Sequence, residues 1–210
     1  MQLEESLTQG AKAMGLALEP GCAQQLVAYV HLLERWAGTH NLTAVRDPQE
    51  MIGRHLLDSL AVLPYLRGPQ VIDVGTGAGL PGIPLACASP DLQFTLLDSN
   101  RKKLAFVRQA VHALSLRNVA VVAARVEDFR SERKFATLVS RAFASIPDML
   151  AACGHLAGPD TRILAMKGVL PREELAHMPP TFQVIDVIAL EIPGLDAERH
   201  LVIITPRRKE

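Results

Sequence analysis

Residues 71–79 have the sequence VIDVGTGAG, and this stretch decides the fold of the chain. The apolar run at 71–74 predicts a buried β-strand, and three glycines at alternate positions follow it directly. Residues 80–86, LPGIPLA, predict the beginning of a helix. A strand, a glycine turn and a helix form a βα unit, and its loop lets a ligand approach the backbone closely because glycine has no Cβ.

An acidic residue at the end of the next predicted strand indicates that the ligand contains a nucleoside. Residues 93–97 predict that strand, and Asp98 follows it. A carboxylate in this place can accept hydrogen bonds from both hydroxyl groups of a ribose. A nucleoside cofactor site is therefore expected at the glycine turn.

The spacing of the glycines favours a cofactor without a pyrophosphate. A dinucleotide fingerprint, G-x-G-x-x-G, would place its third glycine at position 80, where this chain has Leu80. The observed pattern is D-x-G-x-G-x-G, from Asp73 to Gly79. This pattern is similar to the S-adenosylmethionine site of class I methyltransferases.

Composition and length favour one globular domain. The chain has 210 residues, of which 49% are hydrophobic and 21% charged, which allows a sizeable core. Its apolar stretches are too short to span a membrane, and its acidic start is unlike a signal peptide, so we expect a cytoplasmic protein. The three cysteines are far apart and the seven histidines lack metal-site spacing, so we expect no metal.

The formal net charge is zero, but basic residues gather in three parts of the sequence. A neutral protein can still carry a basic face for nucleic acid, although ordinary solvated surface is the alternative. The three groups are Arg35, His40, Arg46, Arg54 and His55; Arg101, Lys102 and Lys103; and Arg207, Arg208 and Lys209.

The rest of the chain alternates predicted helices with predicted strands. Helices are predicted at 22–37, 48–63, 103–114 and 146–156, and further strands at 119–123, 136–141, 162–166, 182–190 and 201–205. The last two strands have no helix between them and should pair antiparallel. We therefore predict an α/β, Rossmann-like fold of the class I methyltransferase type. Its mainly parallel seven-stranded sheet, with a C-terminal antiparallel hairpin, spans a domain at 68–210, and a helical region at 1–67 packs on it.

Six residues with functional side chains or backbones fall at or just past the ends of five different predicted strands. Ligands of such sheets bind beyond the carboxyl ends of the strands, so this convergence predicts one site. The six residues are Gly75, Asp98, Arg125, Glu127, Arg141 and Lys167.

The residues after the fourth predicted strand limit the kinds of methyl acceptor that the site can use. Methylation of an exocyclic amine favours an Asn/Asp-Pro-Pro-aromatic turn there, but this chain has Ser140-Arg141-Ala142-Phe143. Methylation of a pyrimidine carbon needs a cysteine nucleophile, and the loops after the fourth and fifth predicted strands contain none. The pattern favours an acceptor that is already nucleophilic. Guanine N7 is such an acceptor, because it needs orientation but no general base.

Several sequence blocks together resemble the bacterial RsmG (GidB) family. They are Asn41-Leu42-Thr43, Arg54-His55-x-x-Asp58-Ser59, the stretch from Asp73 to Gly82, Leu96-Leu97-Asp98-Ser99, Arg125-Val126-Glu127, Ser140-Arg141-Ala142, Lys167-Gly168 and Glu198-Arg199-His200. The resemblance covers residues 22–206 in order. It implies methylation of N7 of guanine 527, in the 530 loop of bacterial 16S ribosomal RNA, with S-adenosyl-L-methionine as the cofactor.

The resemblance also implies roles for individual residues. The cofactor-binding candidates are Asp73, Gly75, Gly77, Gly79, Leu80, Asp98, Val126, Glu127 and Arg141. The catalytic candidates are Arg141, Arg125 and Asn41, and the RNA-binding candidates are His55, Lys167, Arg199 and His200. Surface ion pairs are the alternative for the arginines and the lysine, and a structural hydrogen bond is the alternative for the two histidines.

Three other functions remain open from the sequence. The first is an NAD-dependent oxidoreductase on a Rossmann fold, against which Leu80 argues. The second is a non-catalytic RNA-binding or assembly protein that has kept the fold. The third is methyl transfer to a small molecule. For the favoured function we expect 16S ribosomal RNA or the small ribosomal subunit as the partner, and a monomeric enzyme.

Overall fold

The computed structural model describes residues 1–132, 134–141, 143 and 145–207, without the side chains of Thr39 and His40. Ala142, Arg208 and Lys209, which the sequence analysis named, lie outside the described residues.

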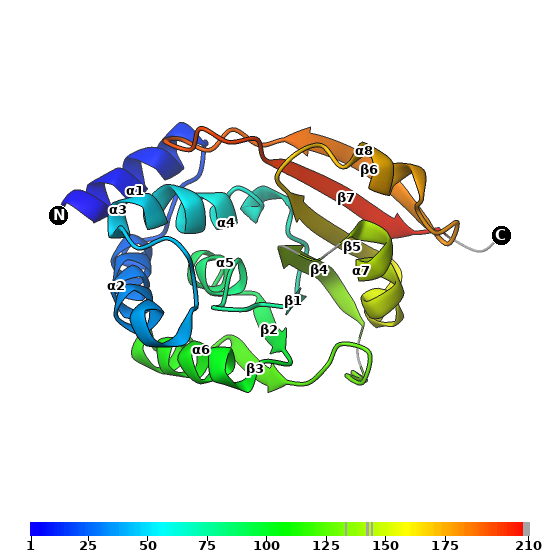
Figure 1. Cartoon of the computed structure of the whole chain (residues 1–210), viewed down its shortest axis with the longest axis horizontal. Helices are drawn as coiled ribbons and strands as arrows, with labels where there is room; N and C mark the ends of the chain where they lie inside the picture. The colour runs from blue at the N-terminus through cyan, green and yellow to red at the C-terminus, as the bar shows by residue number, and fades with distance from the viewer. Residues whose placement is uncertain (133, 142, 144, 208–210) are drawn as a thin grey trace.

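A seven-stranded sheet with the order β3-β2-β1-β4-β5-β7-β6 forms the centre of the molecule (Figure 1). Neighbouring strands from β3 to β5 run parallel, whereas β7 runs antiparallel to both β5 and β6. The predicted fold class and the C-terminal antiparallel hairpin are confirmed. The strands are β1 (Gln70–Val74), β2 (Gln93–Asp98), β3 (Val119–Ala123), β4 (Phe135–Arg141), β5 (Ala157–Lys167), β6 (Phe182–Ala189) and β7 (His200–Pro206).

Helices cover both faces of the sheet, as the apolar strands require. Val71 of β1 packs in the hydrophobic core beneath α2, α5 and α6, whereas its neighbour Ile72 packs in a second core beneath α7. The helices are α1 (Gln2–Ala13), α2 (Cys22–His40), α5 (Gly82–Ala88), α6 (Arg101–Ala113), α7 (Ile146–Cys153) and α8 (Arg172–Ala176). Among the described residues, no helix is both long and apolar enough to cross a lipid bilayer.

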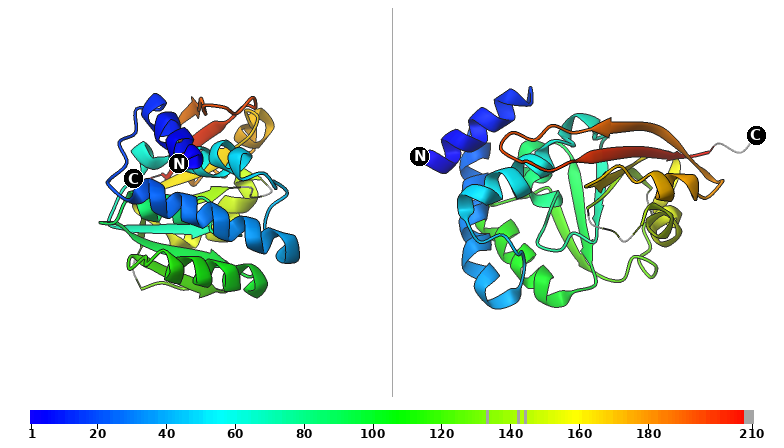
Figure 2. Two further views of the ribbon diagram at one scale, coloured as in Figure 1. Left: turned by 90° about the vertical axis from the view of Figure 1, so that its left-hand side faces the viewer. Right: turned by 45° about the horizontal axis from the view of Figure 1, so that its top comes forward.

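The N-terminal helices share their core with the sheet-covering helices. Tyr29 of α2 lies in one buried cluster with Ile83 of α5 and Phe106 of α6, and its ring stands 6.0 Å from that of Phe106, centroid to centroid. Figure 2 shows α2 lying across the end of the molecule next to α6. The boundary at residue 67 stays a prediction, because the hydrophobic core runs across it.

The predicted helix at 48–63 contains a π-helical turn. Its start is as predicted, with Pro48 in the first position and Gln49 N donating to Asp47 Oδ1 at 2.9 Å. After α3 (Pro48–Met51), residues Ile52–Leu57 are π-helical, and α4 (Asp58–Leu60) follows. A π turn holds an extra residue and occurs often at functional sites. Here it carries His55, and α4 begins with Asp58.

Strand β5 begins at Ala157, five residues earlier than the prediction at 162. The early part pairs Ala157 with Phe135, and a register shift separates this pair from the regular ladder. Side-chain bonds hold the irregularity, since Thr161 Oγ1 accepts from Gly158 N at 2.8 Å and donates to Phe135 O at 2.5 Å. The sequence there is polar and lacks the apolar run on which the strand prediction depended.

Candidate active site

The glycine loop after β1 is held from below by a buried carboxylate. Asp73 Oδ2 accepts hydrogen bonds from Thr76 Oγ1 at 2.6 Å and from Gly82 N at 2.9 Å. A Cβ on Gly82 would come within 2.7 Å of that oxygen, so this glycine is needed for the contact. Burial raises the pKa of Asp73 to about 6. The structure thus places Asp73, a predicted cofactor-binding residue, beneath the loop as its support.

The same loop is held from the side by α2. The hydroxyl of Tyr29 donates to Ala78 O at 2.8 Å. Burial raises the pKa of Tyr29 well above its usual value, so the hydroxyl keeps its proton and remains a donor. The two partners lie 49 positions apart, so no local pattern in the sequence predicts this hydrogen bond.

The glycines of the loop are needed for different structural reasons. Gly75, Gly77 and Gly79 all have positive φ angles, of 71°, 58° and 92°. A Cβ on Gly79 would approach Ile83 Cδ1 to 2.5 Å, so Gly79 is required for packing against α5, and Leu80 beside it is buried. A Cβ on Gly75 would meet no protein atom within 4 Å. Open space therefore lies over the backbone of Gly75, where a ligand can approach it.

A cavity of about 190 Å³ opens beside Gly75. Asp98 stands in it with its carboxylate fixed by two backbone donors, Gly77 N to Oδ2 at 2.8 Å and Asn100 N to Oδ1 at 2.7 Å. Each carboxylate oxygen keeps a further lone pair for a ribose hydroxyl. The lining also includes the predicted residues Arg125, Val126 and Glu127, and two that the prediction missed, Ser99 and Phe143.

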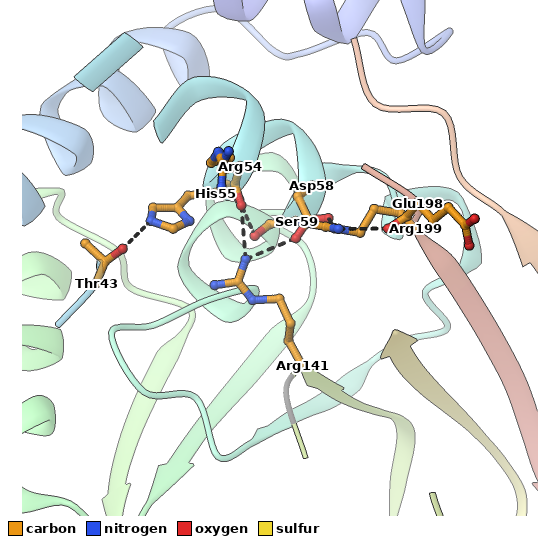
Figure 3. Close-up of polar contacts among 8 residues, drawn as sticks. All are labelled: Thr43, Arg54, His55, Asp58, Ser59, Arg141, Glu198 and Arg199. Carbon is orange, nitrogen blue, oxygen red and sulfur yellow. Dashed lines mark hydrogen bonds and ion pairs between the residues drawn. The ribbon is translucent and has the colours of Figure 1, made fainter. Parts of the chain in front are cut away.

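A second hollow, of about 450 Å³, lies at the ends of β4 and β5 and is called the charged cleft below. Asp58, only 3% exposed in its side chain, stands in it between two arginines (Figure 3). Its Oδ2 accepts from Arg141 Nη1 at 3.1 Å, and its Oδ1 accepts from Arg199 Nε at 2.8 Å. The lining is Val45, Arg54, His55, Asp58, Arg141, Met166, Lys167, Gly168, Leu190, Arg199 and His200.

His55 is a neutral histidine at the wall of the charged cleft. Its Nε2 lies 2.7 Å from Thr43 Oγ1. Burial and the positive charge of Arg141 lower the pKa of His55 to about 4. The ring is therefore uncharged at neutral pH and cannot pair with a phosphate as a cation. This geometry favours the structural alternative for His55.

The remaining RNA-binding candidates of the cleft have protein partners. Lys167 Nζ lies 2.8 Å from Glu174 Oε2, and that same oxygen accepts from Ile146 N at 2.6 Å. His200 Nδ1 lies 2.9 Å from Gly168 O, which fixes Nδ1 as the protonated nitrogen. Glu174 lies on the short helix α8, which the sequence analysis did not predict.

The structure separates the three predicted catalytic residues. Arg141 lies in the charged cleft, whereas Arg125 lines the cavity around Asp98. Asn41 is exposed at the end of α2, with φ of 47°, in the loop that carries Thr43. The strands that lead to the cavity and to the cleft are neighbours in the sheet, because β1 pairs with β4 and Ser140 Oγ donates to Val74 O at 2.8 Å.

Comparison with known proteins identifies the family. Residues 22–202 match the family described as GidB, rRNA small subunit methyltransferase G. The chain belongs to the GidB family. It is 52% identical over 197 residues to Ribosomal RNA small subunit methyltransferase G of Escherichia fergusonii, which covers 94% of this chain and 95% of that protein. A relative of the same name from Escherichia coli O17:K52:H18 is 50% identical over 198 residues, 94% of this chain and 96% of the relative.

Solved structures of other methyltransferases have the same fold as this GidB family member. A ribosomal protein L11 methylase from Lactobacillus delbrueckii subsp. bulgaricus matches 72% of this chain and 77% of its own, with a TM-score of 0.54 and 16% identity. A SAM-dependent methyltransferase from Thiobacillus denitrificans matches 84% of this chain and 97% of its own, with a TM-score of 0.53 and 12% identity. At these identities the likeness concerns the fold alone.

Membership in the GidB family makes the chain an rRNA small subunit methyltransferase that uses S-adenosyl-L-methionine. Family membership therefore excludes the alternative that the protein is an NAD-dependent oxidoreductase. The cavity fits the nucleoside part of this cofactor, because open backbone at Gly75 and a fixed carboxylate at Asp98 stand side by side. Val126 adds a buried apolar surface at the same place.

Gly75→Ala should weaken cofactor binding at least tenfold and cost no more stability than the strain at one residue. The new methyl group meets no protein atom, so the fold bears only the strain of a positive φ angle, about 1–2 kcal/mol. The methyl group would instead occupy the space through which the cofactor approaches. Calorimetric titration with S-adenosylmethionine measures the affinity, and thermal unfolding measures the stability.

Gly15→Ala is a matched control for this substitution. Gly15 has a φ angle of 72°, and a Cβ added there would meet no atom within 4 Å, as at Gly75, but Gly15 follows α1 far from the cavity. Both variants should lose similar stability, and only Gly75→Ala should lose affinity. Equal affinities in the two variants would show that the cofactor does not pass over Gly75.

Proposed function

We propose that the protein transfers a methyl group from S-adenosylmethionine to N7 of guanine 527, in the 530 loop of bacterial 16S ribosomal RNA. The observation that carries the proposal is the pairing of the two strands that lead to the two hollows. Gly75 follows β1 and Arg141 ends β4, and these two strands pair directly, so a cofactor over Gly75 would lie next to a base held in the charged cleft. The resemblance of the sequence blocks supports the choice of base and atom.

The chain's own residues are suited to hold a guanine rather than to remove a proton from it. When bound, the cofactor supplies an electrophilic methyl group on a positively charged sulfur. Guanine N7 has a lone pair and no proton, so the protein needs only to align it in line with that methyl group. Arginine donors suit guanine O6 and the RNA phosphates.

Two buried groups of the charged cleft, Asp58 and His55, already contact other residues. Both oxygens of Asp58 accept from arginines, and His55 has a lowered pKa with Nε2 at the Thr43 hydroxyl. These contacts support an in-line transfer without a protein general base. We further propose that the enzyme acts as a monomer in the cytoplasm, on 16S ribosomal RNA or the small ribosomal subunit.

The proposal is tested by methyl transfer from labelled cofactor to small ribosomal subunits that lack the modification, with the product identified by mass spectrometry. N7-methylguanosine at position 527 is the expected product. A different modified base or position would reject the assigned substrate. Saturable cofactor binding without transfer to any small-subunit RNA would favour the non-catalytic alternative.

The pH dependence of the chemical step gives a further prediction. In single-turnover experiments the rate should stay constant within about threefold between about pH 7 and pH 9, above the raised pKa of Asp73, because no protein group has to lose a proton in the step. Within this range His55 is neutral throughout, since its pKa is lowered to about 4. A rate that rises tenfold per pH unit through part of the range would reveal a general base.

A further inference from the structure

Asp58 lies at the meeting point of three distant parts of the chain. It begins α4, whereas Arg141 ends β4 and Arg199 directly precedes β7. Its two partners are 83 and 141 positions away in the sequence. Figure 3 shows the two arginine side chains reaching the carboxylate from different directions. One carboxylate therefore sets the position of two cations from separate parts of the methyltransferase sheet.

The burial of Asp58 makes its contacts with the two arginines costly to break. A carboxylate that is 3% exposed needs charged or hydrogen-bonding partners, because an unpaired buried charge is strongly unfavourable. The arginine side chains are 23% and 25% exposed, so they are buried on the side of Asp58 and open on the side of the cleft. Each arginine has a second anchor, since Arg141 Nη1 reaches Arg54 O at 3.4 Å and Arg199 Nη1 reaches Glu198 O at 2.8 Å.

The arrangement leaves positive charge and donors for a ligand. Two guanidinium groups share one carboxylate, which leaves a surplus of one positive charge. Within the described part of the chain, these contacts use Nη1 of Arg141 together with Nε and Nη1 of Arg199. Among the described residues no hydrogen-bond partner is found for either Nη2 group, so both can serve a ligand. Lys167, the other cleft cation of low exposure, is matched by Glu174.

We propose that Asp58 is a positioning residue that joins Arg141 and Arg199 into one rigid cationic unit, and that this unit binds an RNA phosphate next to the target guanine. Planar arginine donors match the oxygens of a phosphate, and donors ordered in advance lose less entropy on binding. The inference rests on the proposed function, because it assigns the RNA-side contact of the same cleft. It adds a role for a residue that acts through two arginines rather than through a contact of its own with the base or the cofactor.

The Asp58→Asn variant tests the proposal against simple electrostatics. The substitution removes a negative charge from the cleft, so charge alone predicts tighter RNA binding. The proposal predicts the reverse, because an amide cannot accept from both arginines and at least one of them loses its place. We expect about tenfold weaker binding of a 530-loop RNA hairpin. Loss of one phosphate contact should also lower the slope of log affinity against log salt by about 0.7–0.9.

Glu50→Gln is the matched control. Glu50 is an exposed carboxylate that pairs with exposed Arg54 at 3.5 Å, so this variant makes the same change of charge near the cleft without disturbing Asp58. It should bind the hairpin as tightly as the original chain or more tightly. If Asp58→Asn, folded by circular dichroism, behaves like Glu50→Gln, the positioning role is overturned.

A second set of variants covers the case in which Asp58→Asn does not fold. Arg141→Gln, Arg199→Gln and the double variant change only partly exposed side chains. A single cationic unit predicts that the double variant binds RNA little more weakly than either single variant. If the two arginines acted independently, the fold-losses of RNA affinity in the single variants would multiply in the double variant, and that result would reject the inference.

These binding measurements also separate the inference from the proposed function. If the original chain binds the hairpin in a salt-dependent way but methylates nothing in the small subunit, the function fails, and the comparison of variants still decides the role of Asp58. If binding by the original chain shows no salt dependence, the cleft contacts no phosphate and the inference fails.

Discussion

Asp98→Ala is expected to raise the dissociation constant for S-adenosylmethionine at least about 100-fold. Hydrogen bonds to a charged acceptor contribute about 1.5–3 kcal/mol each, and the carboxylate is placed to accept two from the ribose. The substitution also removes the acceptor for Gly77 N and Asn100 N, so the glycine loop and the start of α6 lose a shared anchor. Calorimetric titration of the purified protein with the cofactor measures the effect.

Asp91→Ala provides the comparison for this variant. Asp91 is an exposed aspartate in the turn before β2, at the opposite end of the strand that Asp98 completes. Its loss should leave the affinity within about twofold. If both variants bound the cofactor equally well, Asp98 would not be the ribose acceptor and the nucleoside would have to lie elsewhere.

Arg141→Gln is expected to lower kcat/KM for small ribosomal subunits by about 10³, while the affinity for the cofactor changes by less than about threefold. The loss should be large because Arg141 presents donors to the charged cleft and is also the partner of Asp58. The affinity for the cofactor should change little, because Asp98, the expected acceptor for the ribose hydroxyls, belongs to a different strand. Steady-state methylation and calorimetric titration separate the two quantities.

Arg108→Gln is the control for the arginine variant, since Arg108 is exposed on α6. This control should keep the activity of the original chain. A cofactor affinity that fell as steeply as the turnover would assign Arg141 to the methionine end of the cofactor instead. If Arg141→Gln kept an activity close to that of the original chain, Arg141 would have no role in the methyl transfer.

The strands and the cofactor loop could be predicted because their signals are local. Apolar runs define β1 and β3, and the carboxyl ends of parallel strands meet at one edge, so Gly75, Asp98 and Arg141 could be placed near one another from their order alone. The early start of β5 could not be predicted, because side-chain bonds of Thr161 hold an irregular, polar segment in the sheet.

The internal organisation of the site depends on partners that are remote in sequence. The motif that contains His55 and Asp58 could be recognised, but their spacing on an α-helix differs from their spacing on a π turn, and apolar periodicity does not distinguish the two. The pairing of Asp58 with Arg199 bridges 141 positions and has no local signal. The motif makes Asp73 a cofactor-binding candidate, which stays a prediction, whereas its hydrogen bonds to Thr76 and Gly82 beneath the loop have no signal in the sequence.

The bond from Tyr29 to Ala78 limits how this protein can be divided or recombined. The sheet and the helices that cover it could be expected to fold and bind the cofactor in the same way with different substrate-recognising extensions attached. Here, however, the extension supplies a hydrogen bond to the loop over which the cofactor binds. A chimera that exchanged the first 67 residues would inherit every strand and still lack one support of its cofactor loop. We therefore expect the two parts to change together during evolution, and an engineer who replaces the first has to restore a donor at the position of that hydroxyl.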